Sequence, residues 1–97
     1  ETLKKIIKIN PITNVKSLLA QAYLRKNDGI VNEFIKKLID EVLFEKPKDP
    51  GANFILAKYL NQNGNKNKSR NLLLKILQNL DDKGPWHQIY KKELNIK

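Results

Sequence analysis

The sequence predicts an all-α protein in which helix-turn-helix units stack into a short α-solenoid closed by a C-terminal helix. Three observations support this prediction: one apolar pattern is written three times, its residues have helical spacing, and short polar turns containing glycine separate the helical segments. Alternation of apolar and polar residues with a period of two never persists, which disfavours strands.

The repeated pattern is the end of a helix. Apolar residues three and four positions apart, followed four positions later by a residue that ends the helix, occur at Leu3, Ile6, Ile7 and Pro11, at Ile39, Val42, Leu43 and Pro47, and at Leu73, Ile76, Leu77 and Asp81. Such spacing places the apolar side chains on one helix face. We therefore expect each copy to end the second helix of a unit.

A first helix precedes the second and third copies. Its apolar residues are Val15, Leu18, Leu19, Ala22 and Tyr23 in one unit and Phe54, Leu56, Ala57 and Leu60 in the next. The turns that follow are residues 26–29 and 61–65, in which Gly29 and Gly64 suit the left-handed conformation past a helix end. The second helices are expected at residues 30–43 and 69–80.

Two helix starts carry proline. Asp49 before Pro50 offers an N-cap side chain, and Gly84 before Pro85 opens a last helix with Trp86, Ile89, Tyr90 and Leu94 at helical spacing. Residues 1–97 are therefore expected to form a single domain: the end of a preceding second helix (1–10), two units (11–46 and 47–82) and a capping helix (84–96).

Composition narrows the functional classes. The 97 residues include no cysteine, which excludes disulfides and cysteine zinc sites. No apolar stretch reaches the roughly 18 residues needed to cross a bilayer, so no membrane contact is expected. Methionine is absent as well, so we expect a processed form or a fragment. The net charge of +9 is compatible with an acidic partner or a nucleic acid.

These residues resemble the tetratricopeptide repeat, a helix-turn-helix unit of about 34 residues. Its first-helix motif is matched by Leu19, Ala20, Ala22 and Tyr23, and again by Leu56, Ala57, Leu60 and Gly64, while Pro11 and Pro47 match its closing proline. Asp81 departs from that proline, Ile35 stands where a small residue is usual, and the first turn is about three residues longer than the family pattern. The resemblance covers nearly the whole chain and implies a scaffold that binds other proteins.

A narrower resemblance concerns the C-terminal part. The run from Ser69 to Leu94, with Gly84-Pro85-Trp86 opening its last helix, is similar to that of periplasmic tetratricopeptide proteins of bacterial c-type cytochrome maturation. This resemblance implies binding of an apocytochrome segment in the periplasm. Without it, the cytoplasm is the expected compartment.

The first helices of such repeats line a concave groove, which is the usual binding surface. The resemblance places in this groove Asn14, Ser17, Gln21, Leu24 and Arg25 of the first unit and Phe54, Lys58, Asn61 and Gln62 of the second, with Leu18 and Ile55 beside them. Amides can pair with a peptide backbone, Arg25 or Lys58 with a carboxylate, and Phe54 with apolar side chains. Alternatively, the amides are simply solvated and Phe54 and Leu18 belong to the core.

Two other functions stay open. The segment between Lys58 and Lys75 has only basic charges, as a nucleic-acid-binding surface would, although no aromatic residue is interleaved with Lys66, Lys68 and Arg70 for base stacking. The chain could also be a structural or oligomerisation module of a larger protein. Exposure of Trp86 and Tyr90 would favour a homodimer or a continuation into further repeats.

No catalytic site, cofactor or metal is expected. His87 is the only histidine and has no neighbouring nucleophile or metal ligand. The acid pairs Asp40-Glu41 and Asp81-Asp82 are adjacent residues rather than neighbours on a helix face, and the sequence has no glycine-rich phosphate loop. We therefore expect a binding protein and not an enzyme.

Overall fold

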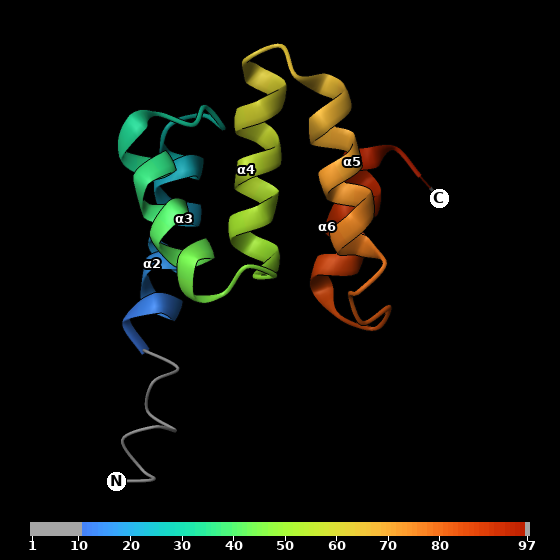
Figure 1. Cartoon of the computed structure of the whole chain (residues 1–97), viewed down its shortest axis with the longest axis horizontal. Coiled ribbons are helices and arrows are strands. Elements are labelled where there is room, and N and C mark those ends of the chain that lie inside the picture. The colour runs from blue at the N-terminus through green and yellow to red at the C-terminus, as the bar shows by residue number, and fades with distance from the viewer. Residues whose placement is uncertain (1–10, 97) are drawn as a thin grey trace, which may run out of the picture.

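The computed structural model describes residues 11–96, and within this range the chain consists of helices and turns without a strand (Figure 1). The helices are α2 (Pro11–Lys26), α3 (Glu33–Glu45), α4 (Pro50–Gln62), α5 (Lys66–Leu77) and α6 (Pro85–Leu94). The all-α prediction is therefore confirmed. The helix end expected at residues 1–10 lies outside the described range. No helix of the described range is long and apolar enough to span a membrane.

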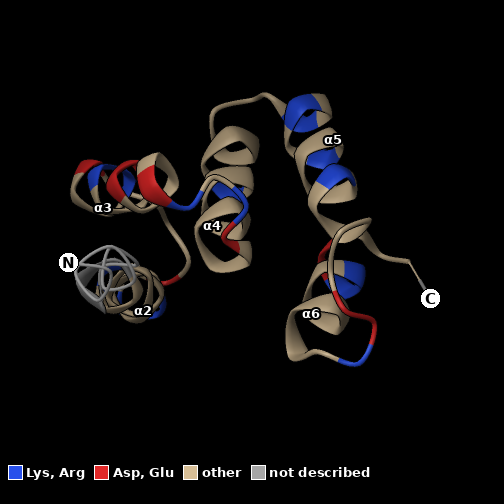
Figure 2. Ribbon diagram, turned by 60° about the horizontal axis from the view of Figure 1, so that its bottom comes forward, with Lys and Arg blue, Asp and Glu red and all other residues tan. Residues whose placement is uncertain are grey.

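The helices pack mainly against their neighbours in the chain. Helix α2 pairs with α3 and α4 pairs with α5; α4 also contacts both α2 and α3, and α6 contacts α5 and α4. In Figure 2, α2, α4 and α6 follow one another across the molecule, with α3 and α5 on the other side of this row. Helix α4 is therefore the central element of the fold.

Two apolar clusters hold the helices together. The first joins α2, α3 and α4 through Ala20, Leu24, Val31, Ile35, Ile39, Val42, Ala52 and Ile55. The second joins α4, α5 and α6 through Ala57, Leu73, Ile76, Tyr90 and Leu94, with Phe54 and Trp86 packed against it. Because α4 contributes to both clusters, its sides are covered by both flanking sets of helices.

The local signals for helix ends act as predicted. The carboxylate of Asp49 accepts a hydrogen bond from the backbone N–H of Ala52 at 2.8 Å, and Pro50 is the first residue of α4. Gly84 and Pro85 open α6 in the same way but without a side-chain cap. Gly29 and Gly64 have φ angles of +80° and +85°, the left-handed conformation that glycine adopts without strain.

The second helices differ in their bounds from the prediction. Helix α3 begins at Glu33 rather than at residue 30, because Asp28 and Gly29 both have positive φ and the side chain of Asn32 caps the helix by accepting from Ile35 N–H at 2.8 Å. Helix α5 spans Lys66–Leu77, so Leu80 lies beyond its end. The connection at residues 27–32 is longer than that at 63–65, as predicted from the first turn.

The buried face of α2 is not the predicted one. Ser17, Ala20 and Leu24 are buried, whereas the apolar residues expected to face the core, including Val15, Leu18 and Leu19, are exposed. The physical reason is that α2 contacts two helices, α3 and α4, and both of them lie on the side of α2 that carries Ala20. Pro11, expected to close a preceding unit, is the first residue of α2, whereas Pro47 lies between α3 and α4.

Candidate functional site

The residues predicted to bind a peptide belong to α2 and α4, two of the three helices that follow one another across Figure 2. On α2, Gln21 lies seven positions after Asn14 and Arg25 four positions after Gln21. On α4, Asn61 and Gln62 lie three and four positions after Lys58, so each set shares a helix face. We call these six residues the inner row. Ser17, Leu24 and Ile55 do not belong to its surface, because all three are buried.

Lys58 links α4 to α6. Its Nζ lies 3.3 Å from Oε2 of Glu93 and 5.0 Å from the centre of the Phe54 ring. About a third of each charged side chain is exposed, 27% for Lys58 and 32% for Glu93, and pairs with this exposure contribute only about 0–1 kcal/mol to stability. Lys58 is thus neutralised locally, but its ion pair can open to a ligand at low cost.

Phe54 belongs to an aromatic cluster and not to a free surface. Its ring centre lies 5.7 Å from those of both Trp86 and Tyr90. Tyr90 is completely buried and donates a hydrogen bond to the backbone carbonyl of Pro50 at 2.5 Å. Burial raises the pKa of Tyr90 above its usual value, and the charge of Asp49 adds to the effect. Because Tyr90 is buried, the condition for an aromatic homodimer contact is not met.

Gln62 fastens the end of α4 to the α2–α3 turn. Its Nε2 donates to the carbonyl of Gly29 at 2.6 Å, and its Oε1 accepts from the backbone N–H of Val31 at 3.0 Å. Both polar ends of the amide are therefore used within the fold. The same bonds bring the C-terminal ends of α2 and α4 close together.

The N-terminal half of α2 is tied to the α3–α4 connection. Ser17 Oγ donates to Asp49 Oδ2 at 2.9 Å, and Gln21 Nε2 donates to Ser17 Oγ at 3.3 Å. Asn14 Oδ1 accepts from Lys46 Nζ at 2.7 Å. These side chains position α2 against the start of α4, so they are fold contacts first.

Of the inner row, only Arg25 and Asn61 are exposed with side chains that make no hydrogen bond or ion pair to other described residues. Arg25 lies in the last turn of α2 and Asn61 in the last turn of α4, the two helix ends that Gln62 holds together. A guanidinium and an amide are thus presented at the same end of the row.

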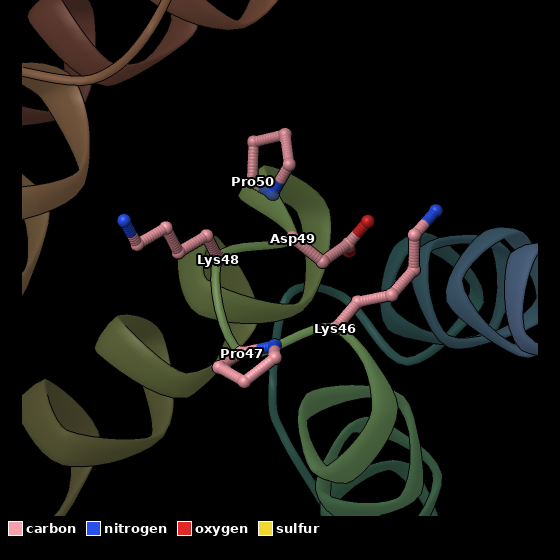
Figure 3. Close-up of a pocket in the computed structure, with 5 residues that line it drawn as sticks. All are labelled: Lys46, Pro47, Lys48, Asp49 and Pro50. Atoms are coloured by element: carbon pink, nitrogen blue, oxygen red, sulfur yellow. The ribbon is translucent and has the colours of Figure 1, made fainter. Parts of the chain in front are cut away.

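A hollow at the α3–α4 connection offers no comparable chemistry (Figure 3). It is open, has a volume of about 450 Å³ and is lined by Lys46, Pro47, Lys48, Asp49 and Pro50. The side chains of Lys46 and Lys48 extend away from each other in Figure 3, so they do not converge on one anion. The carboxylate of Asp49 is already used by Ala52 and Ser17.

The cations of α5 lie on two sides of the helix: Lys66 and Arg70 line a hollow together with Asn61 and Glu93, whereas Lys68 and Lys75 are about half a turn away. Lys66, Lys68, Arg70 and Lys75 are exposed, and no ion pair joins them to the described part of the chain (Figure 2). Lys58 does not add a free cation to them, because it pairs with Glu93. Residues 66–80 contain no aromatic side chain on which a base could stack.

The sequence prediction missed an exposed apolar surface on the first unit. Val15, Leu18, Leu19, Ala22 and Tyr23 of α2 are exposed together with Phe34 of α3, whose ring meets that of Tyr23 edge-on at 5.1 Å. We call these six residues the outer α2 patch. The signal that could have identified it is the equivalence of the two units, in which Ala20 and Ala57 stand 37 residues apart and are both buried.

No metal site stands out. The described residues include no group of three or more histidine, aspartate and glutamate side chains able to hold a metal ion, and Nδ1 of His87 is buried without a hydrogen-bond partner. Comparison of the chain with protein-family models, with curated proteins and with solved structures found no match.

Proposed function

We propose that this chain is a non-catalytic helical-repeat module of tetratricopeptide type that binds a peptide along the inner row. The packing order supports a stacked array, because each first helix contacts its own second helix and also the next first helix, while α3 and α5 do not touch. In such arrays the first helices form the inner, ligand-facing surface.

The observation that carries the proposal is the pair of free groups at one end of the row. Arg25 can make charge-assisted hydrogen bonds to a carboxylate, and the amide of Asn61 can both donate to and accept from a peptide backbone. Next to them, the partly exposed ion pair of Lys58 and Glu93 can exchange its partners for those of a ligand. An extended peptide with an acidic or C-terminal carboxylate fits this arrangement.

A selection experiment tests the proposal. Random peptides of about a dozen residues are displayed, enriched on the immobilised chain and measured by fluorescence anisotropy, where a dissociation constant in the micromolar range is expected. The double variant Arg25→Ser, Asn61→Ser should weaken binding at least tenfold. The matched control Lys26→Ser, Asn63→Ser removes a neighbouring cation and a neighbouring amide, and it should change the affinity less than twofold. Equal effects of the two double variants, or no enrichment at all, would rule the inner row out.

The resemblance of Gly84-Pro85-Trp86 suggests one specific ligand for the same face. If the chain acts in c-type cytochrome maturation, the ligand is the C-terminal segment of an apocytochrome, which ends in a carboxylate. A synthetic peptide with that segment should compete with the selected peptides. A lack of competition would remove the cytochrome context and leave the peptide-binding proposal intact.

The exposed cations of α5 favour nucleic-acid binding as a second candidate function. Binding through them should weaken steeply with added salt, because each phosphate contact releases a counterion. The triple variant Lys66→Ser, Lys68→Ser, Arg70→Ser should then abolish binding of single-stranded RNA, while the Arg25→Ser, Asn61→Ser variant keeps it. If the wild-type chain shows no salt-dependent binding to RNA, this candidate is excluded.

A further inference from the structure

A hollow formed by α4, α5 and α6 borders the inner row. It is open, has a volume of about 210 Å³, and its lining includes the polar residues Asn61, Lys66, Arg70 and Glu93. Asn61 belongs to the inner row itself, and Glu93 forms the ion pair with Lys58 of that row. The other lining residues come from α5 and α6 and are buried, so they form the floor of the hollow. A peptide lying on the inner row therefore has this hollow beside it.

The short length of α6 explains why the hollow is there. Helices α4 and α6 both begin with proline, but α4 has 13 residues and α6 has 10. At the last position of α4, Gln62 bonds to the α2–α3 turn and so joins the ends of α2 and α4. Helix α6 stops three residues short of that position, and Asn95 then turns the chain with a φ of +60°. The end of α4 is thus not joined to α6 in the way that α2 is joined to α4.

The cations at the rim of the hollow are free. Lys66 and Arg70 are four positions apart on α5 and share a helix face. Both are exposed, and no hydrogen bond or ion pair joins their side chains to the described residues. Glu93 is the one acid that lines the hollow, and its carboxylate already lies 3.3 Å from Lys58 Nζ. The rim therefore has an unbalanced positive charge.

The donors and the floor together select the kind of ligand. Lysine and arginine side chains donate hydrogen bonds and accept none, and the guanidinium fork matches the oxygens of a carboxylate or a phosphate. On the floor, Leu73 and Leu94 are apolar, and the hydroxyl of Ser69 already donates to the Ala57 carbonyl at 2.7 Å. Such a floor suits the methylene groups of an acidic side chain. No aromatic residue lines the hollow for a nucleobase to stack on.

We propose that this hollow binds an acidic side chain, glutamate or aspartate, of the peptide that lies along the inner row. Lys66 and Arg70 bind its carboxylate, and the amide of Asn61 bonds to the peptide backbone beside it. This inference rests on the proposed function and narrows the ligand class to peptides with an acid at this position. The acid is additional to the carboxylate that Arg25 can take.

Helix α5 offers a matched pair of variants for the test. The tightest peptide from the selection experiment, and versions in which each acid is changed singly to its amide, are titrated with the 97-residue chain and followed by anisotropy. Lys66→Ser, Arg70→Ser should weaken the parent peptide at least about tenfold, but should change the affinity of one amide version less than about twofold. The control Lys68→Ser, Lys75→Ser removes the same charge about half a turn away and should change the parent affinity less than about twofold. All four positions are exposed, so both variants should fold.

The outcomes separate this inference from the proposed function. Equal losses in the two double variants would mean that net charge alone attracts the peptide, and they would overturn the inference. Wild-type affinity of the Lys66→Ser, Arg70→Ser variant would also overturn it and would leave peptide binding along the inner row intact, whereas a selection without any enriched peptide would remove both. Single-stranded RNA binding that is lost in this variant and kept in the control would assign the hollow to a phosphate of a nucleic acid instead.

Discussion

Removing the side chain of Gln62 should destabilise the whole fold. The Gln62 amide is the hydrogen-bond partner of both Val31 N–H, at 3.0 Å, and the Gly29 carbonyl, at 2.6 Å. Val31 is buried, so Gln62→Ala leaves its N–H without a partner, at a cost of about 1–3 kcal/mol, while the exposed Gly29 carbonyl can turn to water. We expect the free energy of unfolding to fall by about 2 kcal/mol, which for a chain of this size lowers Tm by roughly 8–16 °C.

Urea denaturation, monitored by circular dichroism, measures this loss of stability. Two further variants test whether the loss comes from the two hydrogen bonds of Gln62. Gln62→Glu keeps the acceptor for Val31 N–H but loses the donor to Gly29, so about 1 kcal/mol should be lost. Asn61→Ala changes the neighbouring exposed amide, which has no partner among the described residues, and should stay within about 0.5 kcal/mol of the wild type. A Gln62→Ala variant as stable as Asn61→Ala would refute the assignment of Gln62 to the fold.

Three further predictions concern the ends of helices and the buried tyrosine. Burial, and then the charge of Asp49, raise the pKa of Tyr90, so above pH 10 the unfolded chain loses the phenolic proton first. Stability should therefore fall with rising pH by up to about 1.4 kcal/mol per unit, and Tyr90→Phe should remove this slope in urea titrations between about pH 10 and 12. Asp49→Ala removes the N-cap of α4 and should cost about 1–2 kcal/mol, whereas Asp49→Asn, still a good cap, should keep most of the stability in the same assay. Gly64→Ala forces a side chain into a φ of +85° and should lower Tm by roughly 4–8 °C, about 1 kcal/mol, although no atom lies within 4 Å of the added methyl group.

The elements that the sequence predicts well are those set by local chemistry. The proline and the capping carboxylate at Asp49-Pro50 fix the start of α4, and the glycines at 29 and 64 occupy left-handed positions. The apolar stripe of α3 is equally clear, because Ile35, Ile39 and Val42 are buried on one face of an otherwise charged helix. Each of these signals lies within a few residues of the structure it determines.

The orientation of α2 could not be predicted in this way. Its apolar residues nearly surround the helix, from Val15 and Leu18 on one side to Ala20 and Leu24 on the other. Helical periodicity cannot choose between such faces, since burial depends on which neighbouring helix is present. Only the match between Ala20 and Ala57 distinguishes the face that packs on α3 from the face left open.

The sequence predicts which residues of the candidate site lie on one helix face, but it does not predict which of their polar groups are already bonded within the fold. Helical spacing places Gln21, Lys58 and Gln62 on the inner row, yet their polar groups are used by partners elsewhere in the fold. Lys58 pairs with a residue 35 positions away and Gln62 with one 33 positions away. Such pairings depend on how separate helices stack, which no local pattern specifies. Arg25 and Asn61 remain as the groups that a ligand can take.

The most direct test of peptide binding along the inner row is an NMR titration of the isotopically labelled chain with the tightest peptide from the selection experiment. The account predicts that the largest amide shift changes fall on Gln21, Arg25, Lys58 and Asn61 and that they saturate together. Shift changes confined to residues 66–70 of α5, or to Leu18 and Leu19 on the outer α2 patch, would contradict it.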